Sequence, residues 1–145
     1  MTISNGSNLS KQQLVDGVFT VLKEAYGQSP WSKNQIRADF EQDNTDYFFL
    51  SEDEQVLGFL STQDLFGEME VTNIAILPAY QGRGLSKQLL TNLDEMDEPI
   101  FLEVRESNRK AQGLYQRFGF AKVGCRKNYY HNPIEDAVLM KREAR

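Results

Sequence analysis

The chain has 145 residues, of which 40% are hydrophobic and 26% charged, the composition of a globular protein and not of a disordered one. Sixteen lysines and arginines against 21 aspartates and glutamates give a net charge of −5, which argues against direct nucleic-acid binding because phosphate contacts require a basic face. A single cysteine, Cys125, excludes an internal disulfide and zinc sites built on paired cysteines. A single histidine, His131, excludes most histidine-metal schemes, so we expect no metal.

The length predicts a single domain, residues 1–145. No apolar run approaches the ~18 residues that span a bilayer, and the first residues lack the apolar core of a signal peptide. We therefore expect a cytoplasmic protein that makes no membrane contact. The first ten residues could add an edge strand through Ile3, and Cys125, within a predicted strand, is expected to pack and not to react.

Hydrophobic periodicity and capping residues predict the secondary structure. Ser10 can cap a first helix, in which Gly17 costs up to about 1 kcal/mol relative to alanine, and Gly119 fits the left-handed position past the last helix. The predicted elements are helix Lys11–Tyr26, a shorter helix capped by Ser32 and carrying Ile36 and Phe40, strands Tyr47–Ser51, Gln55–Ser61 and Glu68–Leu77, loop Pro78–Gly84, helix Gly84–Met96, strand Ile100–Arg105, helix Arg109–Phe118, and strands Phe120–Tyr129 and Glu135–Lys141. The central strand–helix–strand segment predicts a right-handed parallel crossover, so the fold class is α/β with a mixed sheet.

The loop after the third predicted strand has the features of an anion site. The segment Gln81-Gly82-Arg83-Gly84-Leu85-Ser86 places two glycines and free backbone N–H groups at a helix start, where the helix dipole is positive. A phosphate or pyrophosphate fits such a place, and Arg83 can add charge at its rim. The P-loop and dinucleotide-binding fingerprints are both absent, and a plain glycine-rich turn is the alternative.

This segment resembles the Gln/Arg-x-x-Gly-x-Gly/Ala loop of the GCN5-related N-acetyltransferase (GNAT) superfamily, with Gln81, Gly84 and Ser86 on the motif positions, although Ser86 departs from Gly or Ala. The resemblance extends from Pro30 onward to the bacterial ribosomal-protein-alanine N-acetyltransferases (RimI type). It is carried by Pro30-Trp31-Ser32, Asn73-Ile74-Ala75-Ile76, Pro78, Leu102-Glu103-Val104-Arg105, Ser107-Asn108, Ala111, Leu114-Tyr115, Gly119-Phe120, Asn128-Tyr129-Tyr130 and Glu135-Asp136-Ala137.

The resemblance implies a GNAT fold, a mixed and mostly antiparallel sheet whose central parallel strand pair is splayed around acetyl-CoA, with helices on both faces. Acetyl-CoA is the implied co-substrate, with its pyrophosphate on the glycine loop and its thioester carbonyl at the end of the preceding strand. The implied contacts are Ile74, Ala75, Ile76, Gln81, Gly82, Arg83, Gly84, Leu85, Ser86 and Asn108. For Asn108, a helix N-cap is an equal alternative.

Two residues are candidates for the chemistry. Glu103 lies mid-strand among apolar residues. By resemblance, it borders the acceptor cleft and acts as general base. The alternative is that Glu103 forms an ion pair, with Arg105 on the same strand face as a candidate partner. By resemblance, Tyr115 donates a proton to the departing thiolate as general acid. The alternative is a core role, because Tyr115 belongs to the apolar stripe of its helix.

By resemblance, the acceptor lies between the first helix–helix loop and the last hairpin. The candidate contacts are Trp31, Tyr129, Tyr130 and Glu135, with hairpin packing as the alternative for the two tyrosines; His131 is expected to be solvated. The implied activity is N-terminal acetylation of a ribosomal protein, alanine first, by a monomer or weak dimer. Acetylation of another peptide, a lysine or a small-molecule amine is the alternative, and a non-catalytic acyl-CoA-binding module is a third possibility.

Overall fold

The computed structural model describes residues 4–145, which fall into two compact units. Unit 1 comprises the residues up to Gln63 together with Thr72–Asp94, and unit 2 comprises Asp64–Val71 together with Glu95–Arg145. That residues 1–145 form a single domain stays a prediction from the length of the chain. Within residues 4–145, no helix is both long and apolar enough to cross a membrane.

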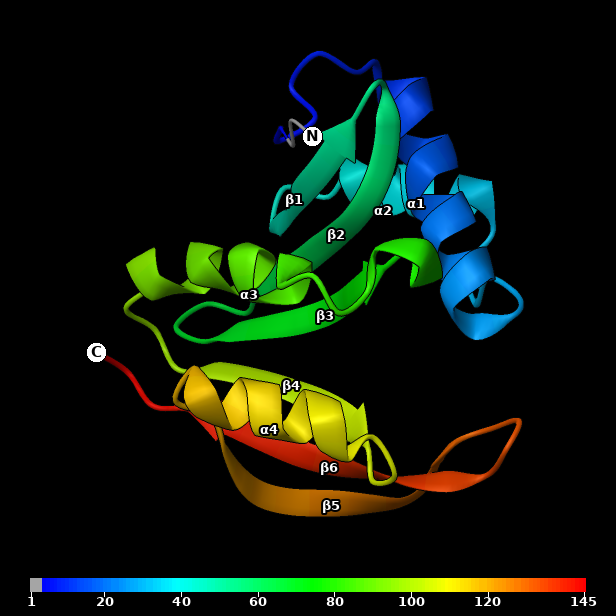
Figure 1. The fold of residues 1–145 in the computed structure, drawn as a ribbon. Helices are drawn as coiled ribbons and strands as arrows, with labels where there is room; N and C mark the ends of the chain where they lie inside the picture. Colours follow the sequence, from blue (N-terminus) through cyan, green and yellow to red (C-terminus); the bar gives the residue numbers. More distant parts are fainter. Residues whose placement is uncertain (1–3) are drawn as a thin grey trace. The chain divides into compact units, whose positions relative to one another are not determined.

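The strands form a mixed sheet of six in the order β1-β2-β3-β4-β6-β5 (Figure 1). The β1–β2, β4–β6 and β5–β6 pairs are antiparallel, whereas β3 and β4 run parallel and pair Met69 with Ile100 and Glu70 with Phe101. The predicted α/β class and the parallel crossover are thereby confirmed. The strands are β1 (Thr45–Glu52), β2 (Gln55–Asp64), β3 (Met69–Ile76), β4 (Ile100–Arg105), β5 (Ala121–Tyr130) and β6 (Glu135–Arg142).

The two helices that begin unit 1 are set by their capping residues. Helix α1 (Lys11–Tyr26) and helix α2 (Lys33–Phe40) each begin with a reciprocal capping box, formed by Ser10 with Gln13 and by Ser32 with Gln35. Both predicted caps are therefore confirmed. Before α1, Ser4 makes an isolated bridge to Ser51, whereas Ile3, through which an edge strand was expected, lies outside the described residues.

Gly17 is explained by the packing of α1 against β2. A Cβ at Gly17 would lie 2.4 Å from Val56 Cγ2 and 2.6 Å from Val56 Cβ, closer than real Cβ contacts. Val15, Val18 and Leu22 on the same helix are fully buried. Gly17 lowers the helix propensity of this segment, but its lack of a side chain allows α1 to approach β2 closely.

The predicted helix at Gly84–Met96 is wrong in its second half. Helix α3 spans Leu85–Leu90, and a 3-10 segment, η2 (Thr91–Glu95), continues it. The Thr91 hydroxyl donates to the Gln88 carbonyl at 2.6 Å, and the Asn92 amide donates to the Leu89 carbonyl at 2.8 Å. Side chains that bond to carbonyls of the preceding turn compete with the α-helical ladder, which accounts for the change of helix type.

In unit 2, helix α4 (Arg109–Arg117) lies across one face of β4 and β6 in Figure 1. Gly119 follows the helix with φ of +92°, as predicted. The buried side chains of this unit include Leu102, Val104, Tyr115, Phe120 and Met140.

The expectation that Cys125 packs is wrong, because its side chain is exposed. Cys125 lies on β5, which is the last strand in the sheet order and therefore has a neighbouring strand on one side only. Most residues of β5 are exposed, including Val123 at 52%. An edge strand of this kind leaves its side chains in solvent even where the sequence alternates like a half-buried strand.

Candidate active site

In unit 1, the glycine loop follows the end of β3 through a short 3-10 turn, η1 (Pro78–Tyr80). The Gln81 amide donates to the Ile76 carbonyl at 3.0 Å and so ties the loop back to the strand. Gly82 and Gly84 both have φ of +79°, in the left-handed region that favours glycine. Gly84 is the N-cap residue of α3, and the chain therefore enters the helix directly from this loop.

The residues of this loop fit a pyrophosphate group. A Cβ added at Gly82 or Gly84 would meet no protein atom within 4 Å, so the backbone at both positions borders open space. The first N–H groups of α3 have no acceptor within the helix and are available to an anion. The Arg83 guanidinium lies 5.1 Å from the centre of the Tyr80 ring, which holds a positive charge beside the loop.

In unit 2, a pocket of about 300 Å³ opens on the sheet face that carries Glu103. Along β4, Leu102 and Val104 are buried, and the residues that alternate with them, Phe101, Glu103 and Arg105, are only partly buried. This alternation puts Glu103 on the face opposite the buried leucine and valine. The pocket is lined by Leu65, Glu68, Glu70, Phe101, Leu102, Glu103, Arg126 and Leu139.

Glu103 does form an ion pair, but its partner is Arg126 and not Arg105. Arg126 Nε lies 3.5 Å from Glu103 Oε2, and the Glu103 side chain is 17% exposed. The geometry is not that of a hydrogen bond, since Oε2 is buried without a hydrogen-bond partner. The Arg105 guanidinium is engaged elsewhere, with Glu135. A carboxylate oxygen that has one loosely placed cation is well suited to accept a further hydrogen bond.

The structure also places Glu70 in this pocket, although Glu70 was not among the site residues predicted from the sequence. The pKa of Glu70 is raised, first by burial of its carboxyl and then by the negative charge on Glu103. Glu70 is the register partner of Phe101 across the parallel pair. Alternation within the predicted strand gives the face of Glu70 relative to its neighbours, but the register of the parallel strands was needed to place it beside Glu103.

Tyr115 occupies the core position that its helical stripe indicated. Its ring is 7% exposed and lies edge-on to the Phe120 ring, with the centroids 6.1 Å apart. Its backbone carbonyl accepts hydrogen bonds from the N–H groups of Phe118 and Phe120, which closes the end of α4. The packing role is therefore observed, and the role as general acid stays a prediction.

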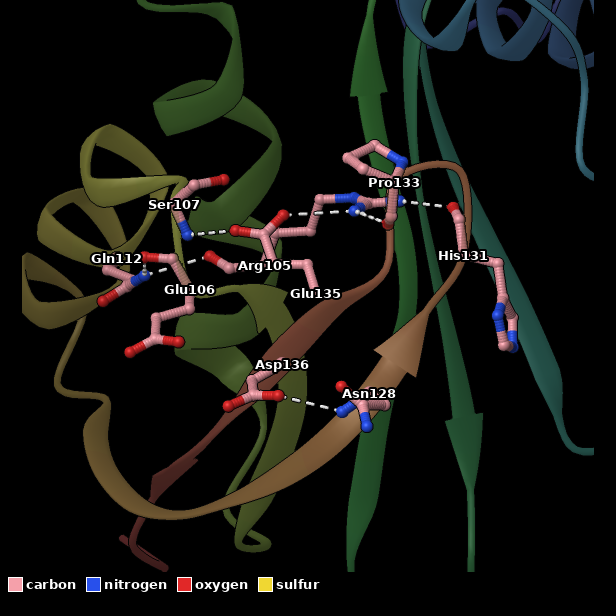
Figure 2. Close-up of polar contacts among 9 residues, drawn as sticks. All are labelled: Arg105, Glu106, Ser107, Gln112, Asn128, His131, Pro133, Glu135 and Asp136. Atoms are coloured by element: carbon pink, nitrogen blue, oxygen red, sulfur yellow. Dashed lines mark hydrogen bonds and ion pairs between the residues drawn. The ribbon is translucent and has the colours of Figure 1, made fainter.

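The turn after β5 is held by Arg105. Its guanidinium donates to the carbonyls of His131 and Pro133 and to Glu135 Oε1, each at 3.1 Å (Figure 2). It also lies 4.5 Å from the centre of the Tyr130 ring. The second Glu135 oxygen accepts the backbone N–H of Ser107 at 2.6 Å. The pKa of Glu135 is lowered, first by a side-chain hydrogen bond with Ser107, and this backbone bond and Arg105 lower it further.

The other predicted contacts divide between the two units. Trp31, Ile74, Ala75, Ile76, Leu85 and Ser86 belong to unit 1, whereas Asn108, Tyr129 and Tyr130 belong to unit 2. The Asn108 side chain accepts a hydrogen bond from the Ala111 N–H at 3.1 Å and caps α4, which is the N-cap role given above as the alternative to a cofactor contact.

The rings of Tyr129 and Tyr130 meet edge-on, with their centroids 5.1 Å apart, and the Arg126 guanidinium lies 5.6 Å from the centre of the Tyr129 ring. Among residues 4–145, no group of three or more His, Cys, Asp or Glu side chains is placed to hold a metal ion.

The fold and these residues identify the class of protein. The chain belongs to the acetyltransferase (GNAT) family, whose pattern matches residues 15–120, and it is therefore an acetyltransferase. Its relatives include the ribosomal protein bS18-alanine N-acetyltransferases of Haemophilus influenzae, 44% identical over 99 residues (63% of this chain and 67% of that protein), and of Escherichia coli, 35% identical over 118 residues (77% and 79%).

The structural comparison agrees with this assignment. The crystal structure of the ribosomal-protein-S18-alanine N-acetyltransferase from Escherichia coli superposes with a TM-score of 0.83, at 30% identity, over 97% of this chain and 92% of that one. The resemblance to the GNAT superfamily and to its ribosomal-protein-alanine branch is therefore confirmed. The predicted GNAT fold is confirmed as well.

Proposed function

We propose that the chain transfers an acetyl group from acetyl-CoA to the N-terminal α-amine of a protein, with the alanine of ribosomal protein bS18 as its first substrate. The observation that carries this proposal is the nearly buried Glu103 carboxylate in a pocket of about 300 Å³, in a chain similar to two enzymes that act on that alanine. Because the enzyme modifies a protein that is translated in the cytoplasm, we propose that it works there, as a monomer or weak dimer.

Acetyl-CoA is the acetyl donor of GNAT enzymes, and it supplies an activated thioester. We propose that its pyrophosphate is held by the backbone of Gln81–Ser86 and by Arg83, since the left-handed glycines leave that backbone open. The backbone N–H groups of Ile74, Ala75 and Ile76 at the end of β3 would receive the thioester oxygen as negative charge develops on it. Asn108 contributes by fixing the start of α4.

The proposed reaction is a direct transfer in which the amine nitrogen bonds to the acetyl carbon and the carbon–sulfur bond breaks. An α-amine has a pKa of about 7.7–8.0 and a lysine side chain about 10.4, so deprotonating lysine costs roughly 3.4 kcal/mol more at neutral pH. This difference favours an N-terminal acceptor. Glu103 takes the proton from the nitrogen, and Tyr115 gives a proton to the departing sulfur.

On the acceptor side, we propose that Trp31, Tyr129 and Tyr130 contact the first residues of the peptide. Glu135 was a candidate contact for the acceptor, but both of its carboxylate oxygens are engaged, with Arg105 and with the Ser107 N–H. We therefore propose that Glu135 shapes the turn and does not bind the acceptor. Tyr129 remains 45% exposed and available for contact.

A peptide panel tests the function. The protein is incubated with acetyl-CoA and a bS18 peptide beginning with alanine, the same peptide with its α-amine blocked, a lysine peptide and spermidine, and the product masses are read. Acetylation of the free α-amine alone is the expected result. Turnover of the blocked peptide or the lysine peptide would instead favour a lysine acetyltransferase, and turnover of spermidine alone would favour a small-molecule enzyme. Absence of α-amine acetylation would refute the proposal.

A further inference from the structure

The pocket in unit 2 contains a second carboxylate that the reaction proposed above does not use. Glu70 on β3 and Glu103 on β4 both line the pocket, as does Arg126 on β5. Glu70 is in register with Phe101, and Phe101 and Glu103 project from the same face of β4, so the two carboxylates share one face of the sheet. Apolar residues complete the lining: Leu65, Phe101, Leu102 and Leu139.

The charges of this lining do not balance. Glu68, Glu70 and Glu103 surround a space whose cationic wall residue is Arg126, and the Arg126 side chain is itself 58% exposed. On the same face, Lys141 lies over the Phe101 ring at 5.3 Å and pairs with Glu143 at 3.4 Å. The pocket therefore has excess negative charge, which a bound monovalent cation would reduce.

The state of Glu70 is consistent with this imbalance. Its pKa is raised by burial, then by the charge on Glu103, while Arg126 acts in the opposite direction and Glu68 adds a smaller upward effect. A cation bound between the two carboxylates would relieve the repulsion. By linkage, such a cation would bind more tightly when Glu70 is ionised than when it is protonated.

We propose that Glu70 is the second anionic contact for the acceptor's ammonium group and holds that group beside Glu103. The inference rests on the proposed function, because it requires the acceptor amine to reach Glu103. An α-amine with a pKa of about 7.7–8.0 is mostly protonated at pH 7, so the group that enters the pocket is a cation. Glu70 holds this cation, and Glu103 removes one proton to give the neutral amine that attacks the acetyl carbon. The second proton is released from the nitrogen as the carbon–nitrogen bond forms, and it balances the proton that Tyr115 gives to the departing sulfur.

Glu70→Gln should separate binding from stability. The substitution keeps the shape of the side chain and removes a charge that repels Glu103, so the melting temperature at pH 7 should rise or stay equal. The same variant should bind the acceptor more weakly. A carboxylate that serves the fold alone would not combine a loss of binding with a gain in stability.

The decisive measurement is steady-state kinetics with acetyl-CoA and an alanine-initiated bS18 peptide at pH 7. For Glu70→Gln, the KM of the peptide should rise about tenfold, the usual effect of losing one charge-assisted contact, with kcat and the KM of acetyl-CoA unchanged within about twofold. Glu70→Asp, which keeps the charge, should recover most of the affinity. Glu54→Gln, in the exposed turn between β1 and β2, is the matched control and should behave like the wild type.

A non-reacting probe gives a readout independent of chemistry. The same peptide without its α-amino group is used as a competitive inhibitor, and its inhibition constant should be equal for the wild type and Glu70→Gln. If the wild type is active but the peptide KM of Glu70→Gln is unchanged, this inference is overturned and the proposed function stands. A lower melting temperature for Glu70→Gln also overturns it. If the wild type acetylates no α-amine, the proposed function fails and this inference fails with it.

Discussion

Arg105 and Glu135 are joined at 3.1 Å and connect the end of β4 to the start of β6. The pair does more than join two strands, because the same guanidinium binds two carbonyls of the turn and the same carboxylate binds the Ser107 N–H ahead of α4. Arg105, on a strand, thus fixes the turn that carries the candidate acceptor residues. A planar guanidinium can make these bonds at once, and a lysine ammonium cannot reproduce their geometry.

The pH dependence of stability should reveal the contribution of Glu135. Its pKa is lowered by the Ser107 hydrogen bond and by Arg105, so its stabilisation is present above the ordinary glutamate pKa of 4.5 and is lost as the pH falls below that value through the folded-state pKa. Melting curves of the wild type and Glu135→Gln should differ at pH 7, with the variant less stable. The difference should shrink towards pH 3; a difference that stays constant with pH would contradict this assignment.

Removal of the Glu103 carboxylate should abolish base catalysis. Glu103→Gln is expected to lower kcat by about 10²–10⁴-fold, the usual contribution of a positioned general base, and to remove the limb of the pH–rate profile that reports the base. Affinity for acetyl-CoA, measured by calorimetry, should stay within about twofold. A rate and profile equal to those of the wild type would remove Glu103 from the mechanism.

The glycine loop offers a test with a matched control. Gly84 and Gly27 have φ of +79° and +82°, and an added Cβ meets no protein atom within 4 Å at either position. Alanine at either site should therefore destabilise the fold by a similar amount, about 1–2 kcal/mol, because an L-residue is strained there. Gly84→Ala should in addition raise the KM of acetyl-CoA severalfold, and Gly27→Ala should not. Equal KM values for the two variants would place the pyrophosphate elsewhere.

Two glycines within helices should respond to alanine with opposite signs. Gly17→Ala gains helix propensity of up to about 1 kcal/mol but forces a Cβ to within 2.4 Å of Val56, and overpacking costs about 1–3 kcal/mol, so a net loss is expected. Gly113→Ala in α4 meets no atom within 4 Å and should gain up to about 1 kcal/mol. Denaturant unfolding monitored by circular dichroism measures both. A gain at Gly17 would show that Val56 moves aside.

Elements with local causes could be predicted from the sequence. Both capping boxes, the bounds of α1 and β4, and the left-handed Gly119 follow from side chains within a few residues of each feature. The 3-10 segment was missed because Thr91 and Asn92 read as ordinary helix surface until their bonds to the preceding carbonyls are seen. Hydrophobic periodicity does not detect side chains that compete with the backbone for the carbonyls of the preceding turn.

The pocket could be predicted only in part. Glu103 is conspicuous as a carboxylate in an apolar strand, but its partner Arg126 depends on the pairing of β5 with β6, which shifts register between Arg126 and Tyr130. If the pairing continued regularly from Tyr130 and Glu135, the pair next to the turn, Arg126 would lie opposite Leu139. Its observed partner is Ala137. Glu70 likewise depends on the register of a parallel pair, which chain order does not determine.

The exposed thiol of Cys125 has a practical consequence for studying this enzyme. It is the one cysteine in the sequence, and maleimide dyes would therefore attach with a stoichiometry of one and without prior mutagenesis. Successive strand residues face opposite ways, so a fluorophore there would sit next to Arg126 in the chain but on the other side of the sheet. Its emission could then report events at the neighbouring strand residue without blocking entry to the pocket.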